Sequence, residues 1–376
     1  MIFTKFQKDS CNKKNDLRSM EKKKIIILQS SLMQYRVPTW NILADKYDLT
    51  IGYFDKGLPK DCEKHFKVHK FGSRKFGPFI FIFNLRNYLQ QFDVVCFVPD
   101  PHIPSFVVLP FLPHKYKLLT WSIGFRCSYT HPYLVDRKHT IMDRVVYQWI
   151  FNKVDANIFY MKNALAFWRD NQIDKNRVFV APNTTDVEPI DLIPKKKTGF
   201  LFVGTLYRGK GIEFLIESFK NAINKTGSDV KLTIVGNGEM RNELENYVVC
   251  NNLENNVEFT GAIYDETLLA THFQKALLCI SPTQGGLSCP KSMGYGVPFV
   301  CRRDAITGGE IHHMTDGVNG IMYDSNTDLD DILVDAINNP SKYVEMGVKA
   351  KHYYDNNATP KHMAQGVTNA IEFTLN

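Results

Sequence analysis

The chain has 376 residues, of which 44% are hydrophobic and 23% are charged. This length exceeds what one hydrophobic core comfortably serves, and the composition is that of a folded protein rather than a disordered one, so two domains are expected. The longest apolar runs, around 76–83 and 103–112, are too short or are broken by proline, which excludes a membrane-spanning helix.

The net charge of +7 is divided unevenly along the chain. Residues 1–190 carry 29 Lys and Arg against 17 Asp and Glu, a net charge of +12, whereas residues 191–376 carry 17 against 22, a net charge of −5. A basic first half suits a phosphorylated substrate or an anionic membrane surface, although solvated surface lysines explain it as well. Nucleic acid is disfavoured, because the chain has no recognition motif and its basic residues are dispersed.

The cellular setting is predicted from the termini and the cysteines. Residues 1–19 are polar and basic without an apolar signal core, so we expect a leader or an upstream start before Met20, and a cytoplasmic protein. The eight cysteines are scattered without a CxxC pair, which favours reduced core residues over disulfides or a metal site.

Buried strands alternate with helices through residues 20–190, as in one doubly wound domain. Strands are expected at 25–29, 49–54, 93–98, 116–121, 156–160 and 178–181. The stretch 76–83 is interpreted as a core helix, with membrane docking as the alternative. Ligands bind at the carboxyl ends of strands in such sheets. Candidates for ligand binding in this first domain are Tyr35, Arg36, His102, Gly124 and Arg126.

A second α/β domain is expected after the proline- and lysine-rich linker at 183–198. We assign residues 191–350 to this domain, and residues 351–376 to a C-terminal helix that packs back on the first one. The opening stretch of the second domain, GFLFVGTLYRGKG at 199–211, predicts a strand, a basic turn and the start of a helix at Ile212. Free N–H groups at a helix N-terminus, beside Arg208 and Lys210, favour a phosphate, although ordinary capping of a core helix explains the same pattern.

The second half also carries LTIVGNGEMRNELE, VEFTGAI, SPTQGGLSCPKSMGYGVPFV and DGVNGIMYD. In this order the motifs, which span 199–324, resemble the donor-binding half of glycosyltransferase family 4, glycosyl transferases group 1. The resemblance implies a GT-B fold of two Rossmann-like domains facing a cleft. It also implies a nucleotide-sugar donor as co-substrate, transfer with retention of configuration, and no metal or other cofactor.

The resemblance also implies the residues of a donor site. Lys210 falls where the family has its phosphate-binding lysine, and Arg208 stands close to the usual arginine. The segment 260–263 corresponds to the strand end beside which the family seats the nucleobase, and 285–288 to a loop near the sugar or diphosphate. The donor-binding candidates are Gly204, Thr205, Arg208, Lys210, Gly261, Gly285, Gly286, Leu287, Ser288, Lys291 and Glu310.

One departure from the family concerns its two glutamates, whose positions are occupied here by Thr283 and Lys291. Lys291 is expected either to contact the donor phosphates or to be solvated. Glu310, which follows two glycines that permit close backbone approach, is a hypothetical replacement carboxylate. We therefore name Glu310, Arg208 and Lys210 as catalytic candidates and no residue as a metal ligand.

The sequence thus predicts a retaining, metal-independent glycosyltransferase that acts on a saccharide or lipid-linked acceptor in surface polysaccharide synthesis. The basic first half is expected to contact an anionic membrane peripherally, at the inner face. The alternative is an inactive GT-B scaffold that binds a nucleotide sugar or a partner, because the two glutamates are missing. An epimerase acting on a nucleotide sugar is disfavoured, because no clear set of acid and base side chains is present.

Overall fold

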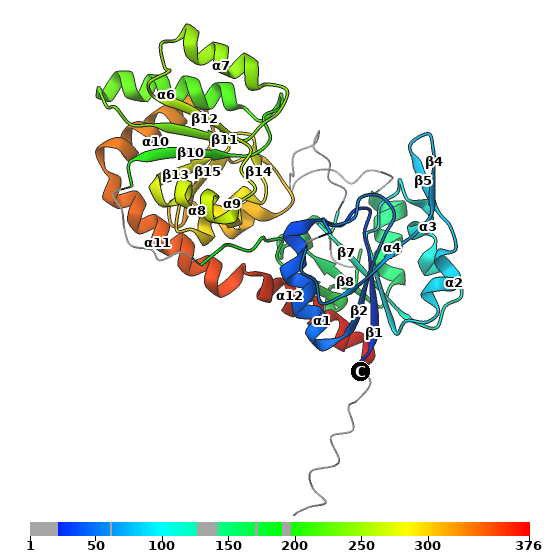
Figure 1. Ribbon diagram of the computed structural model, residues 1–376. Helices are drawn as coiled ribbons and strands as arrows, with labels where there is room; N and C mark the ends of the chain where they lie inside the picture. Colours follow the sequence, from blue (N-terminus) through cyan, green and yellow to red (C-terminus); the bar gives the residue numbers. More distant parts are fainter. Residues whose placement is uncertain (1–21, 61, 126–140, 142, 170–171, 190–196) are drawn as a thin grey trace, which may run out of the picture.

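The computed structural model describes residues 22–60, 62–125, 141, 143–169, 172–189 and 197–376. The chain forms two lobes, each built around a parallel sheet with helices on its faces (Figure 1). The predicted α/β fold class, with two Rossmann-like sheets, is therefore confirmed. The predicted domain boundary at residue 190, the leader at 1–19 and the candidate Arg126 lie outside the described residues.

The N-terminal lobe is built on a seven-stranded sheet with the order β3-β2-β1-β6-β7-β8-β9, in which every pair is parallel. Its strands are β1 (Lys24–Leu28), β2 (Asp48–Tyr53), β3 (Lys67–Lys70), β6 (Val94–Phe97), β7 (Lys117–Ser122), β8 (Ala156–Phe159) and β9 (Val178–Val180). Its helices are α1 (Val37–Lys46), α2 (Leu85–Leu89), α3 (Pro104–Val107), α4 (Gln148–Lys153) and α5 (Ala164–Phe167). Short helical turns are η1 (Gln34–Arg36), η2 (Leu109–Phe111), η3 (Asp143–Tyr147) and η4 (Lys175–Arg177).

The C-terminal lobe is built on a six-stranded parallel sheet with the order β12-β11-β10-β13-β15-β17. Its strands are β10 (Gly199–Val203), β11 (Leu232–Val235), β12 (Val257–Gly261), β13 (Ala276–Ile280), β15 (Phe299–Arg302) and β17 (Gly320–Tyr323). A separate parallel pair joins β14 (Gln284–Gly285) to β16 (Ile306–Thr307). The helices are α6 (Ile212–Thr226), α7 (Arg241–Cys250), α8 (Glu266–Lys275), α9 (Ser288–Gly294), η5 (Glu310–His313), α10 (Asn326–Asn338), α11 (Pro340–Asn357) and α12 (Pro360–Leu375).

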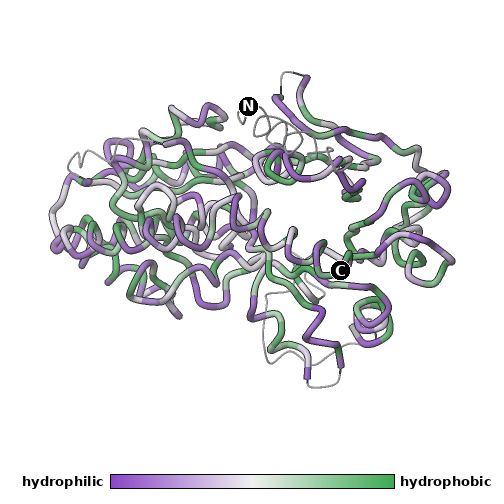
Figure 2. Tube along the Cα trace, turned by 90° about the horizontal axis from the view of Figure 1, so that it is seen from below, coloured by the Kyte–Doolittle hydropathy of each residue, from purple (hydrophilic) through white to green (hydrophobic). Residues whose placement is uncertain are grey.

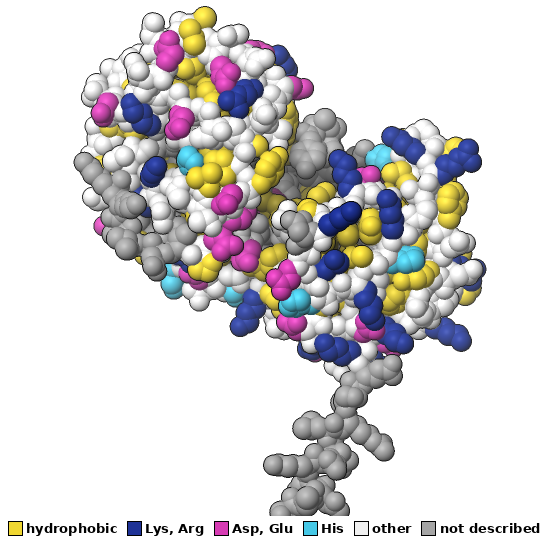
Figure 3. Space-filling model, in the orientation of Figure 1, with side chains coloured by type: hydrophobic (Ala, Val, Ile, Leu, Met, Phe, Trp, Pro, Cys, Tyr) yellow, Lys and Arg dark blue, Asp and Glu magenta, His cyan; other side chains and the backbone are white. Residues whose placement is uncertain are grey.

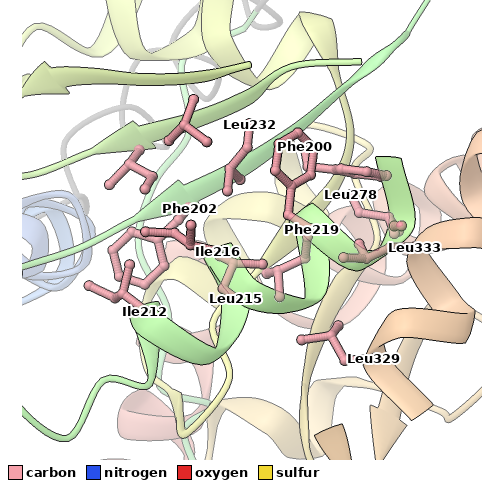
Figure 4. Packing of buried hydrophobic residues seen from close by; sticks show 14 of the residues in the cluster. Phe200, Phe202, Ile212, Leu215, Ile216, Phe219, Leu232, Leu278, Leu329 and Leu333 are labelled. Carbon is pink, nitrogen blue, oxygen red and sulfur yellow. The ribbon is translucent and has the colours of Figure 1, made fainter. Parts of the chain in front are cut away.

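The core of the C-terminal lobe forms where α6 covers β10 (Figure 4). Ile212, Leu215, Ile216 and Phe219 recur at helical spacing and are all buried, so they present one apolar stripe to the sheet. Each fully buried side chain of this size contributes about 1.5–3 kcal/mol. This packing fixes the start of α6 against the carboxyl end of β10.

The C-terminal helices cross from one lobe to the other (Figure 1). Helix α11 packs against α9 in the C-terminal lobe, whereas α12 packs against α1, β7, β8 and β9 in the N-terminal lobe. Gly366 permits the close contact of α12, because a Cβ at this residue would lie 2.1 Å from the Val180 carbonyl oxygen. The two lobes are therefore held together by a chain segment that belongs to both.

Strands in three stretches of the chain differ from the sequence prediction. Residues 67–70 form the edge strand β3 inside a stretch expected to be a surface excursion, and 320–323 form the edge strand β17, which was not predicted. The stretch 76–83, interpreted as a core helix, instead contributes to an antiparallel hairpin of β4 (Ser73–Phe76) and β5 (Phe79–Ile82). The helix interpretation is wrong because FIFIF alternates with the period of a strand, which aims Phe and Ile at opposite faces.

Figure 2 shows hydrophobic segments gathered inside the lobes and hydrophilic residues along many outer loops and turns. Within the described part of the chain, no helix has both the length and the apolar character needed to cross a bilayer.

Candidate functional site

The turn between β10 and α6, residues 204–211, lies at the carboxyl end of its sheet. Gly211 precedes the first residue of α6 with a φ of +69°, a left-handed conformation that favours glycine. A Cβ there would meet Thr283 Cγ2 at 2.9 Å. The glycine therefore lets the turn approach the neighbouring loop while the first N–H groups of the fifteen-residue helix α6 stay at the sheet edge.

Lys210 lies within this turn and is half-buried. Its Nζ sits 5.5 Å from the centroid of the Tyr207 ring, and no carboxylate of the described residues forms an ion pair with it. Burial lowers the pKa of the Lys210 ammonium below its ordinary value, because the charged form loses water without gaining an anion. A bound phosphate would supply the missing negative charge.

Arg208, the other predicted cation, lies on the exposed side of the same turn. Its Nη2 donates to Glu243 Oε2 of α7 at 3.2 Å, and its backbone N–H donates to Glu239 Oε1. Its side chain is 73% exposed. The structure therefore places Arg208 near Lys210 in the chain but pairs it with α7, and its role toward a donor stays a prediction.

The turn 204–211 packs against the second predicted loop, which begins at Thr283. The Thr283 hydroxyl donates to the Gly209 carbonyl at 2.5 Å, and the Tyr207 hydroxyl donates to Gln284 Oε1 at 2.5 Å. The structure thus brings together the two loops that the sequence predicted as a donor site. Of the remaining candidates, Thr205 is exposed, Gly286, Leu287 and Ser288 are half-buried, and Gly285 is buried.

Glycines also occupy the ends of the neighbouring strands. The Gly204 N–H donates to the Val235 carbonyl at 3.0 Å, and the Gly236 N–H donates to the Gly261 carbonyl at 2.9 Å. A Cβ at Gly236 would lie 1.9 Å from the Gly204 carbonyl oxygen, so no larger residue fits. Gly261 itself has a φ of +81°. The ends of β10, β11 and β12 therefore meet as bare backbone.

Lys291 differs from both of its predicted roles. Its Nζ lies 2.6 Å from both carboxylate oxygens of Glu266, and only 13% of its side chain is exposed. Lys291 is therefore neither solvated nor free to meet a phosphate in this structure, because the ion pair joins α9 to α8. Sequence spacing could not reveal this partner, which lies 25 residues away.

Glu310 is buried, and both of its carboxylate oxygens are occupied. Oε1 accepts a hydrogen bond from Asn183 Nδ2 at 2.6 Å, while Oε2 accepts from the Thr307 hydroxyl at 3.0 Å and the Gly308 N–H at 2.7 Å. Burial raises the pKa of Glu310, and these hydrogen bonds oppose the rise. The carboxylate thus stabilises the turn at 307–310 and also bonds to Asn183, which precedes the second domain. Its contact with sugar or ribose hydroxyls stays a prediction.

Asn183 is a residue that sequence reasoning missed, since it appeared only as the start of a linker. Its Oδ1 accepts from Arg36 Nη2 at 3.2 Å, and its carbonyl lies 3.0 Å from His313 Nε2. The network therefore runs from Arg36 in the N-terminal lobe through Asn183 to Glu310 in the C-terminal lobe. The buried Asn183 amide therefore joins the two lobes, because it bonds both to the Arg36 guanidinium and to the Glu310 carboxylate.

The ligand-binding candidates of the N-terminal lobe, which the resemblance assigns to the acceptor side, separate into two places. Arg36 is buried, with its guanidinium 4.9 Å from the Trp121 ring and its Nη2 donating to the Tyr160 hydroxyl at 2.7 Å. Tyr35 lies beside it, and Gly124, with a φ of +97°, follows β7. His102 instead pairs with Asp100 on the exposed surface beside the β4–β5 hairpin, so the structure does not bring it to the other candidates.

Among the described residues, no three His, Cys, Asp or Glu side chains are grouped so that they could hold a metal ion. Metal independence stays a prediction.

Substituting Glu310→Gln is expected to destabilise the protein. The new amide NH₂ must face either the Gly308 N–H, whose direction is fixed by the backbone, or the Asn183 NH₂, whose orientation is fixed by Arg36. A buried donor left against a donor costs about 1–3 kcal/mol. Urea unfolding measures this loss, with the exposed Glu345→Gln as the matched control; equal unfolding midpoints for the two variants would contradict the network.

Residues 197–339 match the model of the family described as glycosyl transferases group 1. An uncharacterized glycosyltransferase of Methanocaldococcus jannaschii, MJ1178, is 27% identical over 225 residues, which make up 57% of this chain and 59% of that protein. A second one from the same organism, MJ1069, is 25% identical over 49% of each chain. The match thus spans less than two thirds of these relatives' lengths.

Solved structures share the fold over nearly the whole chain. HepE of Anabaena, determined in complex with UDP, has a TM-score of 0.70 at 16% identity, covering 93% of this chain and 99% of that one. A TarM mutant of Staphylococcus aureus, determined with UDP, Fondaparinux and α-GlcNAc-glycerol, has a TM-score of 0.67 at 15% identity, with coverage of 93% and 99%. At these identities the likeness concerns the two-lobed architecture.

Proposed function

We propose, because residues 197–339 match the model of the glycosyl transferases group 1 family, that the chain transfers a sugar from a nucleoside diphosphate sugar to a saccharide or lipid-linked acceptor. The observation that carries this proposal is Lys210, a half-buried cation with no carboxylate partner among the described residues, at the start of α6. The site lacks an anion, and the diphosphate of a donor would provide one.

The chemistry of transfer explains why these groups suit the task. Cleavage of the bond between the anomeric carbon and the diphosphate leaves negative charge on the leaving oxygen. A fixed ammonium and backbone N–H groups at a helix N-terminus stabilise this charge more strongly as it develops, which lowers the barrier. Lys210 and the first turn of α6 are the groups of this chain that hold the leaving diphosphate.

The finer features of the proposal rest on the resemblance. Retention of configuration and metal independence are properties that the family motifs imply. The solved neighbours HepE and TarM were determined with UDP, so a uridine diphosphate sugar is the first donor to test. A neighbour named WaaG is described as a glycosyltransferase involved in lipopolysaccharide biosynthesis, which supports a role in surface polysaccharide synthesis. The place at the inner face of a membrane rests on the basic first half of the chain.

One observation favours a second candidate, a scaffold that binds a nucleotide sugar without turnover. Thr283 and Lys291 carry no carboxylate, and the carboxylate of Glu310 is engaged by Asn183, Thr307 and Gly308. Slow hydrolysis of the donor in the absence of acceptor would support the transferase. Donor binding with no chemistry, in the presence or absence of acceptor, would support the scaffold.

Lys210→Ala is expected to abolish most of the thermal stabilisation by nucleotide sugars. Binding to the folded state alone raises the melting temperature by mass action. Losing a hydrogen bond to a charged group of about 1.5–3 kcal/mol weakens binding roughly ten- to a hundredfold. A thermal-shift panel of UDP-, GDP-, CDP-, ADP- and dTDP-sugars measures the effect.

Lys225→Ala is the matched control for this panel, because Lys225 lies in the last turn of the same helix and pairs with Asp331. A shift that both variants retain would contradict the assignment of the phosphate site. No shift with any donor would contradict donor binding altogether.

The affinity for UDP is expected to fall as pH rises through the lowered pKa of Lys210. Below this pKa the ammonium is charged and attracts the diphosphate; above it the neutral amine does not, while lysines with ordinary pKa values stay charged to about pH 10. Isothermal titration calorimetry between pH 7 and pH 10 follows the change. Lys210→Arg is the control, because a guanidinium stays protonated throughout. Parallel pH profiles for the two proteins would refute the role of Lys210.

A further inference from the structure

The β4–β5 hairpin forms a two-stranded sheet of its own at the edge of the N-terminal lobe (Figure 1). Its register places Phe76 opposite Phe79 and Arg74 opposite Phe81. Residues opposite each other, and residues two apart on one strand, share a face of a sheet. One face of the hairpin therefore carries these four side chains, which we call the outward face.

The other face of the hairpin is tied to the lobe. Ile82 is buried, and Ile80 packs against the same core cluster. The Ile80 N–H donates to the His102 carbonyl at 2.8 Å, and the Ile82 N–H donates to the Ser105 hydroxyl at 2.9 Å. The hairpin is thus held in place by its isoleucines, and this anchoring fixes the direction of the outward face.

The outward face exposes large aromatic side chains to water. Phe76 is 53% exposed, Phe79 44% and Phe81 39%, and Phe83, the next residue of the alternation, is 51% exposed. The rings of Phe76 and Phe81 lie 5.9 Å apart, and the Arg74 guanidinium lies 5.0 Å from the Phe76 ring. Contiguous exposed apolar groups of this kind mark an interaction surface.

The charge around the hairpin has a single sign. Residues 64–92 contain six Lys and Arg and not one Asp or Glu. Lys67 pairs with Asp48, but no carboxylate of the described residues forms an ion pair with Lys64, Lys70, Arg74 or Lys75. In Figure 3, Lys and Arg side chains outnumber acidic ones on the visible face of this lobe. The surface thus combines aromatic rings with uncompensated positive charge.

We propose that the outward face of the β4–β5 hairpin docks the protein on an anionic lipid bilayer, with its phenylalanines and Arg74 at the headgroups. Lys75, which is exposed on the opposite face of the same strand, lies close enough to be attracted by the anionic headgroups. This combination of apolar rings and Lys or Arg is what an anionic membrane surface binds. A second copy of the chain fits less well, because two hairpins face to face would bring like charges together. The inference deepens the proposed function, on which it rests, since docking would bring the site to a lipid-linked acceptor.

The test is flotation of the full-length protein with vesicles. Vesicles of phosphatidylcholine with about one third phosphatidylglycerol are compared with vesicles of phosphatidylcholine alone, without any nucleotide sugar. We expect binding to the anionic vesicles that weakens as salt is raised. Arg74→Glu combined with Lys75→Glu should reduce the partition coefficient more than tenfold, since each cation near such a surface is worth about fivefold. Phe79→Ser combined with Phe81→Ser should reduce it similarly.

Matched controls lie on the C-terminal helices and on α7. Lys349→Glu with Lys361→Glu makes the same change in net charge at exposed positions, and Val249→Ser with Val348→Ser removes exposed apolar side chains elsewhere. These controls should bind vesicles as the wild type does. The hairpin variants should keep the wild-type thermal shift with a nucleotide sugar, which shows that they fold and separates this test from that of the proposed function.

The proposal is overturned if the wild type does not float with anionic vesicles, or if the hairpin variants float as well as their controls. Self-association of the wild type in sedimentation velocity that Phe79→Ser and Phe81→Ser abolish would also overturn it, since the occupant would then be a second copy.

Discussion

The candidate site depends on backbone segments that approach more closely than side chains would permit. Gly236 crosses the Gly204 carbonyl where a Cβ would lie 1.9 Å from the oxygen, and Gly211 passes Thr283 with a positive φ. The first contact joins the ends of β10 and β11, and the second brings the β10–α6 turn against the loop after β13. The close approach places the half-buried ammonium of Lys210 at the start of α6. The lysine and the positive end of the helix dipole therefore both favour an anion at this place.

A second constraint joins the two lobes. Glu310 and Arg36 are buried charges of opposite sign that come from different lobes, and the Asn183 side chain bonds to both. Buried charges require such partners, because an unpaired one loses its hydration without compensation. Together with α12, which packs on the sheet of the N-terminal lobe, this network fixes how the two lobes are joined.

Much of the fold could be predicted because buried parallel strands and amphipathic helices leave periodic patterns, as in β10 and α6. An edge strand such as β3 could not, since it is mostly exposed and only four residues long. The meeting of the turn 204–211 with the loop at 283–288 could be predicted, because glycines at fixed places in the chain permit close backbone approach; the role of these loops toward a donor stays a prediction. The partners of Lys291 and Glu310 could not, because Glu266 and Asn183 reach them only through tertiary packing.

The most direct test of the account is a crystal structure of the protein with UDP or a UDP-sugar bound. The account predicts the diphosphate at the N-terminus of α6, with a phosphate oxygen within hydrogen-bond distance of Lys210 Nζ and the base beside the end of β12. A nucleotide bound elsewhere, or a diphosphate held without Lys210, would contradict it.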